Sequence, residues 1–182
     1  AIRARGTITG ALADFGEYIK VEGAISSYGQ GDVLAVSNIG NETATKSTTA
    51  YQENILGIVT TTASFVAGGE GAGIEFDEKG KATNRVIISL AGRVPVKVSL
   101  ENGPIKIGDY LTSSSTPGVA MKATKAGMIV GEALENYSGE GAGKVMVFVK
   151  LGYFNGIKIV DMLDQDALGS ISSDFSQLVL AK

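Results

Sequence analysis

Short runs of apolar residues, alternating with polar ones or nearly continuous, recur along the chain and predict an all-β fold. In residues 93–98 the valines occupy alternate positions, so they share one face of a strand. Residues 55–59 are apolar on both faces, as is typical of a buried strand. Strands at intervals of roughly ten residues favour a barrel or a sandwich. The other segments with a strand pattern are residues 18–21, 33–36, 74–76, 86–90, 105–111, 128–135 and 144–151.

Three features predict where this strand pattern is interrupted. Pro95 points away from the valine face and has no amide hydrogen, which indicates an edge strand or a bulge. Residues 38–46 are polar and contain Asn, Gly and Thr, so we expect a loop or a hairpin tip there. Residues 78–81 read as a second hairpin turn.

The pattern changes after residue 151. Apolar residues at 160, 163, 168, 171, 175 and 178 are three to five positions apart, which fits an amphipathic helix better than a strand, and Ser173 with Asp174 can cap its second segment. We therefore expect a lead-in at 1–13, a β domain at 14–151 and a short helical or extended tail at 152–182. The tail docks on the β domain, pairs with other subunits or leads into a further module.

The β domain contains one series of landmarks twice, at about 18–76 and 95–149. The first two landmarks recur after 77 residues, the third after 74 and the last after 70, as expected if the second copy has shorter loops. Such duplication predicts a scaffold built from two pseudo-repeated β units, either as one closed barrel or as two packed lobes. The landmarks are Lys20-Val21 with Lys97-Val98, the Gly-Asp-x-Leu elements at 31–34 and 108–111, the glycines Gly57 and Gly131, and the Gly-Glu-Gly-Ala-Gly runs at 69–73 and 139–143.

The Gly-Asp-x-Leu element has a structural explanation. Glycine permits a positive φ at a turn, and the Asp carboxylate can accept backbone N–H groups that the turn leaves unpaired. The leucine two residues after the aspartate is expected to point into the core.

Composition narrows the classes of function. The 182 residues are 44% hydrophobic and 19% charged, with a net charge of −3, so binding to nucleic acid or to an anionic membrane is disfavoured. No apolar run is long enough to span a membrane. Cysteine and histidine are both absent, which excludes thiol catalysis, disulfides and imidazole-based triads, and no cofactor is expected. The chain begins with Ala, as expected for a processed product or a piece of a longer polypeptide.

Two patterns resemble catalytic or binding motifs but have simpler explanations. The Gly-Glu-Gly-Ala-Gly runs lead into strand-like segments and carry a glutamate, whereas a phosphate loop precedes a helix and usually contains Lys followed by Ser or Thr. Residues 113–116 (Ser-Ser-Ser-Thr) and Lys122 could form a Ser–Lys nucleophile pair, but Pro and Gly follow at once, which favours a polar hairpin tip.

Asp14 and Glu17 are the candidate catalytic residues. They are expected to be solvent-facing carboxylates at the start of a strand, or else a general base and a water-orienting group that act on a neighbouring peptide bond. If this chain has an activity, we expect it to act on that peptide bond, near the N-terminus. An enzyme that acts on an external substrate is disfavoured, because no convergent acid, base and nucleophile are visible.

Six segments follow one another in an order that is found in a known family. They are residues 13–18 (ADFGEY), 55–59 (ILGIV), 90–98 (LAGRVPVKV), 103–118 (GPIKIGDYLTSSSTPG), 121–123 (MKA) and 130–135 (VGEALE). Together they resemble a family of C-terminal modules on phage tail spikes and fibres, which includes the intramolecular chaperone domains classed as G2 peptidases. Similar modules are found at the ends of large β-rich surface proteins of bacteria. The resemblance spans about residues 13–151 and is most specific from 92 to 123.

This resemblance implies a β module that forms a homotrimer at the end of a fibre and helps the upstream shaft enter register. In some members of the family the module is then released by self-cleavage near its own N-terminus, for which Asp14 is the candidate here. The implied location is the virion or a bacterial cell surface, and the partners are the fibre shaft or other virion proteins. Apart from the resemblance, the low charge and the strands that are apolar on two faces favour self-association.

A second class has a similar pattern. Capsid-decoration proteins of phages also combine Gly-Asp followed by apolar residues, a Val-Gly-x-Ala-Leu segment (residues 130–134) and a final valine-rich strand. They are β-rich, trimeric and non-catalytic. A long shaft upstream of this chain would favour the fibre module, and a free-standing gene of this size would favour decoration.

Overall fold

The computed structural model describes residues 14–67, 73–78, 80 and 82–156, and they form a nearly all-β structure. A short 3-10 helix, η1 (Ile25–Ser27), is the one helical element among them. The predicted helical tail lies outside the described residues, except for its first five. The strands are β1 (Asp14–Val21), β2 (Val33–Val36), β3 (Thr43–Lys46), β4 (Ile55–Thr60), β5 (Phe65–Ala67), β6 (Arg85–Val98), β7 (Tyr110–Ser113), β8 (Ala120–Lys122), β9 (Gly127–Ala133) and β10 (Gly143–Phe154).

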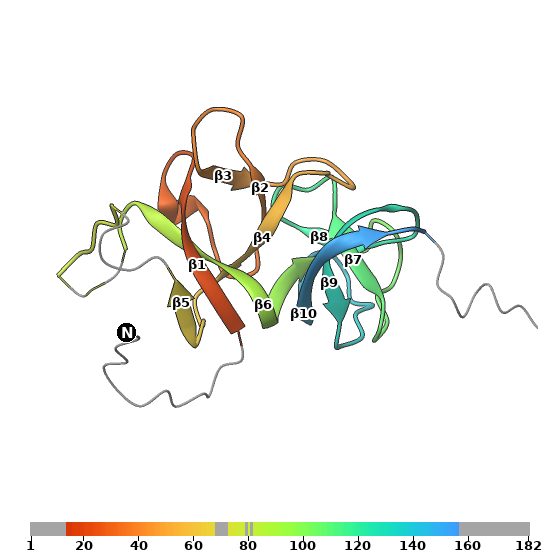
Figure 1. The fold of residues 1–182 in the computed structure, drawn as a ribbon. Helices are drawn as coiled ribbons and strands as arrows, with labels where there is room; N and C mark the ends of the chain where they lie inside the picture. The colour runs from red at the N-terminus through yellow and green to blue at the C-terminus, as the bar shows by residue number, and fades with distance from the viewer. Residues whose placement is uncertain (1–13, 68–72, 79, 81, 157–182) are drawn as a thin grey trace, which may run out of the picture.

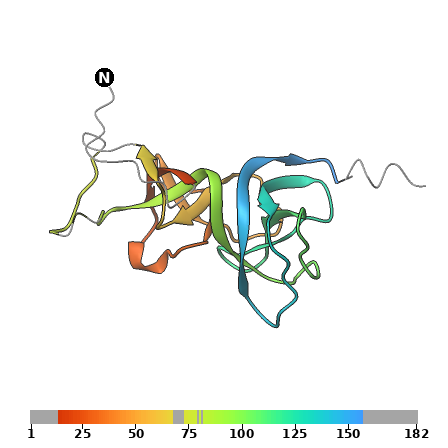
Figure 2. The same ribbon diagram turned by 90° about the horizontal axis from the view of Figure 1, so that it is seen from below.

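All ten strands belong to one large mixed sheet, and the long strand β6 passes through both halves of the molecule (Figure 1). In the first half each strand pairs with the next in the order β1, β3, β2, β4, β6, and β6 also pairs with β1. In the second half each strand pairs with the next in the order β6, β8, β7, β9, β10, and β10 also pairs with β6. The two halves lie side by side when the molecule is viewed from below (Figure 2).

The two halves have similar strand pairings. The first strand of each half pairs antiparallel with the last, as β1 does with β6 and β6 does with β10. In both halves the third strand pairs in parallel with the first, as β3 does with β1 and β8 with β6. The two halves therefore share one arrangement of strands.

The last landmark of the repeat does not share this equivalence. The second Gly-Glu-Gly-Ala-Gly run ends at Gly143, where β10 begins, whereas the first ends at Gly73, well before β6 begins at Arg85. The extra residues of the first half contain strand β5 and the isolated bridge between Phe76 and Ala82, which has no counterpart in the second half.

Three short strands were not predicted. Residues 43–46 were expected in a loop but form β3, and β5 and β8 carried no strand prediction. Each is only three or four residues long, which is too short to show a clear alternation of apolar and polar residues. Their pairing comes from neighbouring strands, since β3 is hydrogen-bonded to both β1 and β2.

Pro95 was expected at a sheet edge or a bulge. It lies within β6, in the middle of the strand order, but at this position β10 is the one described strand that pairs with β6, so the other side of β6 is locally an edge. Amide groups of alternate residues point to the same side of a strand. The Lys97 amide donates to the Gly31 carbonyl at 3.0 Å, so the Pro95 nitrogen also faces Gly31 and not β10. Proline is tolerated here because β10 takes no hydrogen bond from that position.

The core consists of two main clusters. The larger contains the alternating valines Val94, Val96 and Val98, all with no exposed surface, as their spacing predicted. The smaller lies in the first half and contains Leu34 and Ile88. The leucines of both Gly-Asp-x-Leu elements, Leu34 and Leu111, are fully buried, which confirms their predicted core position.

Candidate functional site

Asp14 is a buried carboxylate at the start of β1. It lies opposite Gly92 of β6 and is only 4% exposed. Its main-chain carbonyl accepts a hydrogen bond from the Ser64 amide at 3.0 Å. Neither carboxylate oxygen has a hydrogen-bond partner within the part of the chain that the structure describes. A buried carboxylate without hydrogen-bond donors is unfavourable and therefore requires an explanation.

Glu17 lies on the opposite face of β1 and is exposed. Asp14 and Gly16 are buried while Phe15 and Glu17 are not, as the alternation of side chains along a strand requires. The structure therefore does not bring the two candidate carboxylates together as a pair. Of the two, Asp14 has the less usual environment.

The Ser–Lys pair is not formed. Lys122 of β8 makes an ion pair with Asp109 at 2.9 Å. The Ser113 hydroxyl donates to the Thr49 carbonyl at 2.8 Å, and that of Ser115 donates to Glu101 at 2.8 Å. Residues 114–119 connect β7 to its antiparallel partner β8, in agreement with the predicted polar hairpin tip.

The second Gly-Glu-Gly-Ala-Gly run leads directly into β10, as predicted, so it lacks the helix that a phosphate loop requires. Most of the first run lies outside the described residues.

The Gly-Asp turns form the same hydrogen bonds in both halves. Gly31 and Gly108 have φ of 90° and 82°, a backbone conformation that favours glycine. The Asp32 carboxylate accepts the Gly29 amide at 2.8 Å, and the Asp109 carboxylate accepts the Lys106 amide at the same distance. This is the turn-stabilising role that the sequence predicted for the aspartate.

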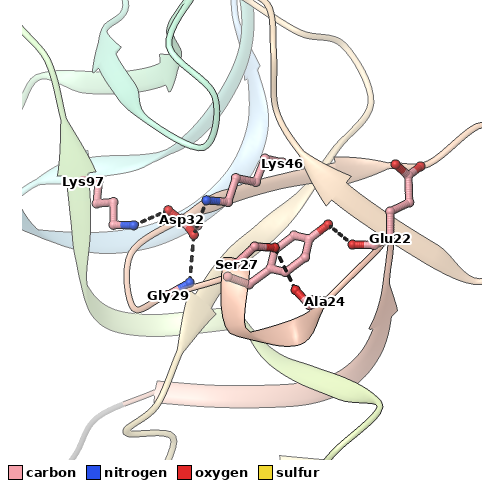
Figure 3. Close-up of polar contacts among 8 residues, drawn as sticks. Glu22, Ala24, Ser27, Gly29, Asp32, Lys46 and Lys97 are labelled. Atoms are coloured by element: carbon pink, nitrogen blue, oxygen red, sulfur yellow. Dashed lines mark hydrogen bonds and ion pairs between the residues drawn. The ribbon is translucent and has the colours of Figure 1, made fainter.

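Asp32 has an additional role that sequence reasoning missed. It is 1% exposed and makes ion pairs with Lys97 at 2.5 Å and with Lys46 at 3.1 Å (Figure 3). Lys46 belongs to the first half, whereas Lys97 belongs to the part of β6 that pairs with β10. The carboxylate therefore joins the two halves. The repeated lysines and aspartates were visible in the sequence, but their contact across the halves was not.

Tyr28 lies beside this cluster and is half-buried. Its hydroxyl donates to the Glu22 carbonyl at 2.8 Å, and the Lys46 ammonium lies 5.8 Å from its ring centroid. Burial is the main cause that raises the pKa of Tyr28 above its ordinary value of 10.0. A hydrogen bond with Thr45 acts in the opposite direction, and the negative charges of Glu22 and Asp32 raise the pKa further.

A largely apolar cavity of about 760 Å³ lies on the first half. The residues that line it include Tyr18, Tyr28, Thr60 and Arg85. None of the candidate catalytic residues lines it. Among the described residues, no group of acidic side chains gathers closely enough to hold a metal ion, and no helix could cross a membrane.

No protein family model and no curated protein matches the chain. Two crystal structures are similar in fold. One is a C-terminal fragment of bacteriophage phi29 gene product 12, with 21% identity, a TM-score of 0.49, and coverage of 75% of this chain and 100% of the fragment. The other is the pre-mature bacteriophage phi29 gene product 12, with 22% identity, a TM-score of 0.52, and coverage of 82% of this chain but only 23% of that longer chain. The second similarity, at 22% identity, shows a shared fold and no more.

Proposed function

We propose that this chain is an assembly module of a phage tail protein, which forms a homotrimer at the end of a fibre and acts as an intramolecular chaperone for the shaft. The observation that carries the proposal is the fold shared with the pre-mature phi29 gene product 12 over 82% of this chain. The segments that resemble tail-spike chaperone modules lie mainly in or beside the strands of that fold. The proposed location is the virion.

The strand pairings support a scaffold role. In each half the last strand pairs with the first, so we infer that each half forms a small barrel and that β6 belongs to both barrels. Closed pairing leaves few free sheet edges, which lowers the risk of uncontrolled aggregation while chains assemble. A rigid double scaffold of this kind suits a module that must hold three chains in one arrangement.

The chaperone role is tested on the complete gene product that contains this sequence. We expect the complete product to form stable trimers and a version that lacks residues 14–182 to aggregate or remain monomeric, as measured by sedimentation velocity. If the shortened product assembles as well as the complete one, the chaperone role is wrong. A gene product without any upstream shaft would favour the capsid-decoration alternative instead.

Self-release is a separate part of the proposal and depends on Asp14. The carboxylate is buried at the start of β1 without a described partner, next to the peptide bond that joins residues 13 and 14. Mass spectrometry of the complete product after folding should show a fragment that begins near Asp14. The Asp14→Asn variant should stay intact, whereas Glu17→Gln should still be cleaved. An intact wild-type chain after folding would contradict self-release and leave the assembly role standing.

A further inference from the structure

Tyr51 has a backbone conformation that is unusual for a large side chain. Its φ is 57°, in the left-handed region that glycine adopts readily and bulky residues rarely do. Residues 48–53, which include Tyr51 and which we call the strap, lie in the connection from β3 to β4 and extend toward the second half (Figure 1). Strained residues of this kind persist only where surrounding contacts fix them, and they cluster at ligand clamps and switch regions.

The backbone of the strap is fastened to Ser113, the last residue of β7 in the second half. The Tyr51 amide donates to the Ser113 carbonyl at 3.0 Å, and the Gln52 amide donates to the Ser113 hydroxyl at 2.8 Å. That hydroxyl donates in turn to the Thr49 carbonyl at 2.8 Å. One residue of the second half therefore holds three residues of the strap.

The Tyr51 side chain reaches further into the second half. Its hydroxyl accepts the Asn102 side-chain amide at 3.0 Å and the Thr124 main-chain amide at 2.8 Å. The Lys125 ammonium lies 4.7 Å from the ring centroid. A Cβ on Gly127, the first residue of β9, would lie 2.8 Å from the ring, so glycine at that position allows the ring to approach. These contacts are the ones that fix the strained backbone.

Tyr51 packs on a small apolar cluster of the second half. Ala123, Ile129 and Phe154 form this cluster and are buried, and Tyr51 and Tyr110 pack against it. Phe154 is the last residue of β10. A residue of the first half thus closes over an apolar cluster at the end of the last strand of the second half.

The strap itself contributes little to the core. Each of residues 48–53 is exposed or half-buried, whereas the flanking residues Ser47 and Ile55 are buried. The Gln52 side chain accepts the Thr48 amide at 2.8 Å, so the strap is also braced internally. Segments with few buried apolar contacts and exposed backbone hydrogen bonds are the ones that open locally while the rest of a protein stays folded.

We infer that the strap is a latch between the two halves, and that it opens as one unit while both halves stay folded. The contacts of Tyr51 with the second half favour the closed position, whereas release of its strained backbone favours the open one. In the open position the cluster that contains Phe154 is exposed to solvent. The end of β10, from which residues 157–182 continue, is thus fastened by a residue of the first half. The latch does not depend on the proposed assembly role.

A thiol beneath the strap reports its opening. The chain contains no cysteine, so Ala123→Cys places a single thiol in the cluster on which Tyr51 packs. A maleimide reacts with this thiol only when it is exposed, and with rapid closing the labelling rate follows the population of open chains. We expect labelling at least ~10-fold faster than the global unfolding constant of the same variant allows, as measured by urea denaturation, because opening of the strap is sufficient to expose the thiol. Ile129→Cys, which adds no volume to the cluster, should give the same result.

Two further substitutions in the Ala123→Cys background separate the strap from the rest of the fold. Tyr51→Phe keeps the ring but removes the hydroxyl to which Asn102 and Thr124 donate, so labelling should become at least ~10-fold faster. Ile88→Val is the matched control, because Ile88 is 3% exposed and belongs to the core cluster of the first half. It should lower the midpoint of urea denaturation and leave the labelling rate unchanged, since that cluster stays intact when the strap opens.

Each other outcome overturns the latch. A labelling rate equal to that set by global unfolding, or a rate that Ile88→Val raises in proportion to the lost stability, would mean that the cluster opens only with the whole fold. A rate that Tyr51→Phe leaves unchanged would mean that the Tyr51 hydroxyl does not hold the strap closed. All of these results concern one chain by itself, so they leave the assembly role standing.

Discussion

At the scale of single residues, the most consequential side chain of the described fold is Asp32. Its carboxylate accepts the Gly29 amide and pairs with two lysines, one from each half. The duplicated residue Asp109 makes the corresponding turn bond and the pair with Lys122. An aspartate at equivalent positions thus stabilises a turn in both halves, and Asp32 also links the two halves through its ion pairs.

Asp32→Asn should lower the free energy of unfolding by about 1–3 kcal/mol, because two lysines lose their counter-charge at a buried position while the turn bond is retained. This loss of stability is expected to be smaller than the loss on breaking a fully buried ion pair, because both lysine side chains are partly exposed. Urea denaturation measures the change. Glu53→Gln, at an exposed carboxylate, should change stability by less than about 0.5 kcal/mol. Equal effects of both variants would contradict the role of Asp32.

Tyr28 gives a pH-dependent prediction. Because burial raises its pKa in the folded chain, the neutral phenol contributes stability that is fully present below the ordinary value of 10.0 and is lost as the pH rises through the higher folded pKa. Urea midpoints between about pH 9 and pH 11 should therefore fall less steeply for Tyr28→Phe than for wild type. Tyr153→Phe, at a residue that is 70% exposed, should leave the slope unchanged.

At the scale of elements, a glycine in the fourth strand of each half allows close approach of the next strand. A Cβ on Gly57 would lie 2.9 Å from the Ser89 carbonyl of β6. A Cβ on Gly131 would lie 2.6 Å from Val147 Cγ1 of β10 and nearer still to the Phe148 carbonyl. Both glycines belonged to the third landmark of the sequence repeat, and the structure explains why that landmark is glycine.

Gly131→Ala should therefore destabilise the fold by about 1–3 kcal/mol, as overpacking of a fixed backbone does. Gly152→Ala is the matched control on β10, because a Cβ there meets nothing within 4 Å. Thermal unfolding followed by circular dichroism compares the two. If Gly131→Ala is as stable as Gly152→Ala, the backbone of β9 and β10 is more adaptable than the structure indicates.

At the scale of the whole molecule, the two halves share β6 and the larger core cluster. That cluster combines Val33 and Ile58 of the first half with Val96, Leu111 and others of the second. Backbone hydrogen bonds also cross between the halves, from Val33 to Gly118 at 2.9 Å and from Gly118 to Ser47 at 2.8 Å. Neither half has a complete core without the other.

The two halves should therefore unfold in one cooperative transition. The chain has no tryptophan, so Tyr18→Trp and Phe148→Trp provide one fluorescence reporter in each half. Their urea midpoints should coincide with each other and with the circular dichroism transition. Two separate midpoints would show that the halves are independent domains.

The sequence by itself determined the features that depend on local pattern. Alternating valines specified the buried face of β6, and the two Gly-Asp turns with their buried leucines were predicted because glycine conformation and side-chain capping act within a few residues. The duplication was visible because equivalent strands require similar residues at similar spacing.

Only the tertiary structure decided what depends on contacts between distant segments. The short strands β3, β5 and β8 form where neighbouring strands supply hydrogen bonds, and each is too short for a local pattern to predict it. Pro95 is tolerated in β6 because its nitrogen points toward a turn of the first half, so β10 needs no hydrogen bond from it. Asp14 and Glu17, close in sequence, are separated because successive side chains point to opposite faces, whereas Asp32 and Lys97 are brought together by strand pairing across the repeat. Long-range pairing fixes all of these, and no local pattern encodes it.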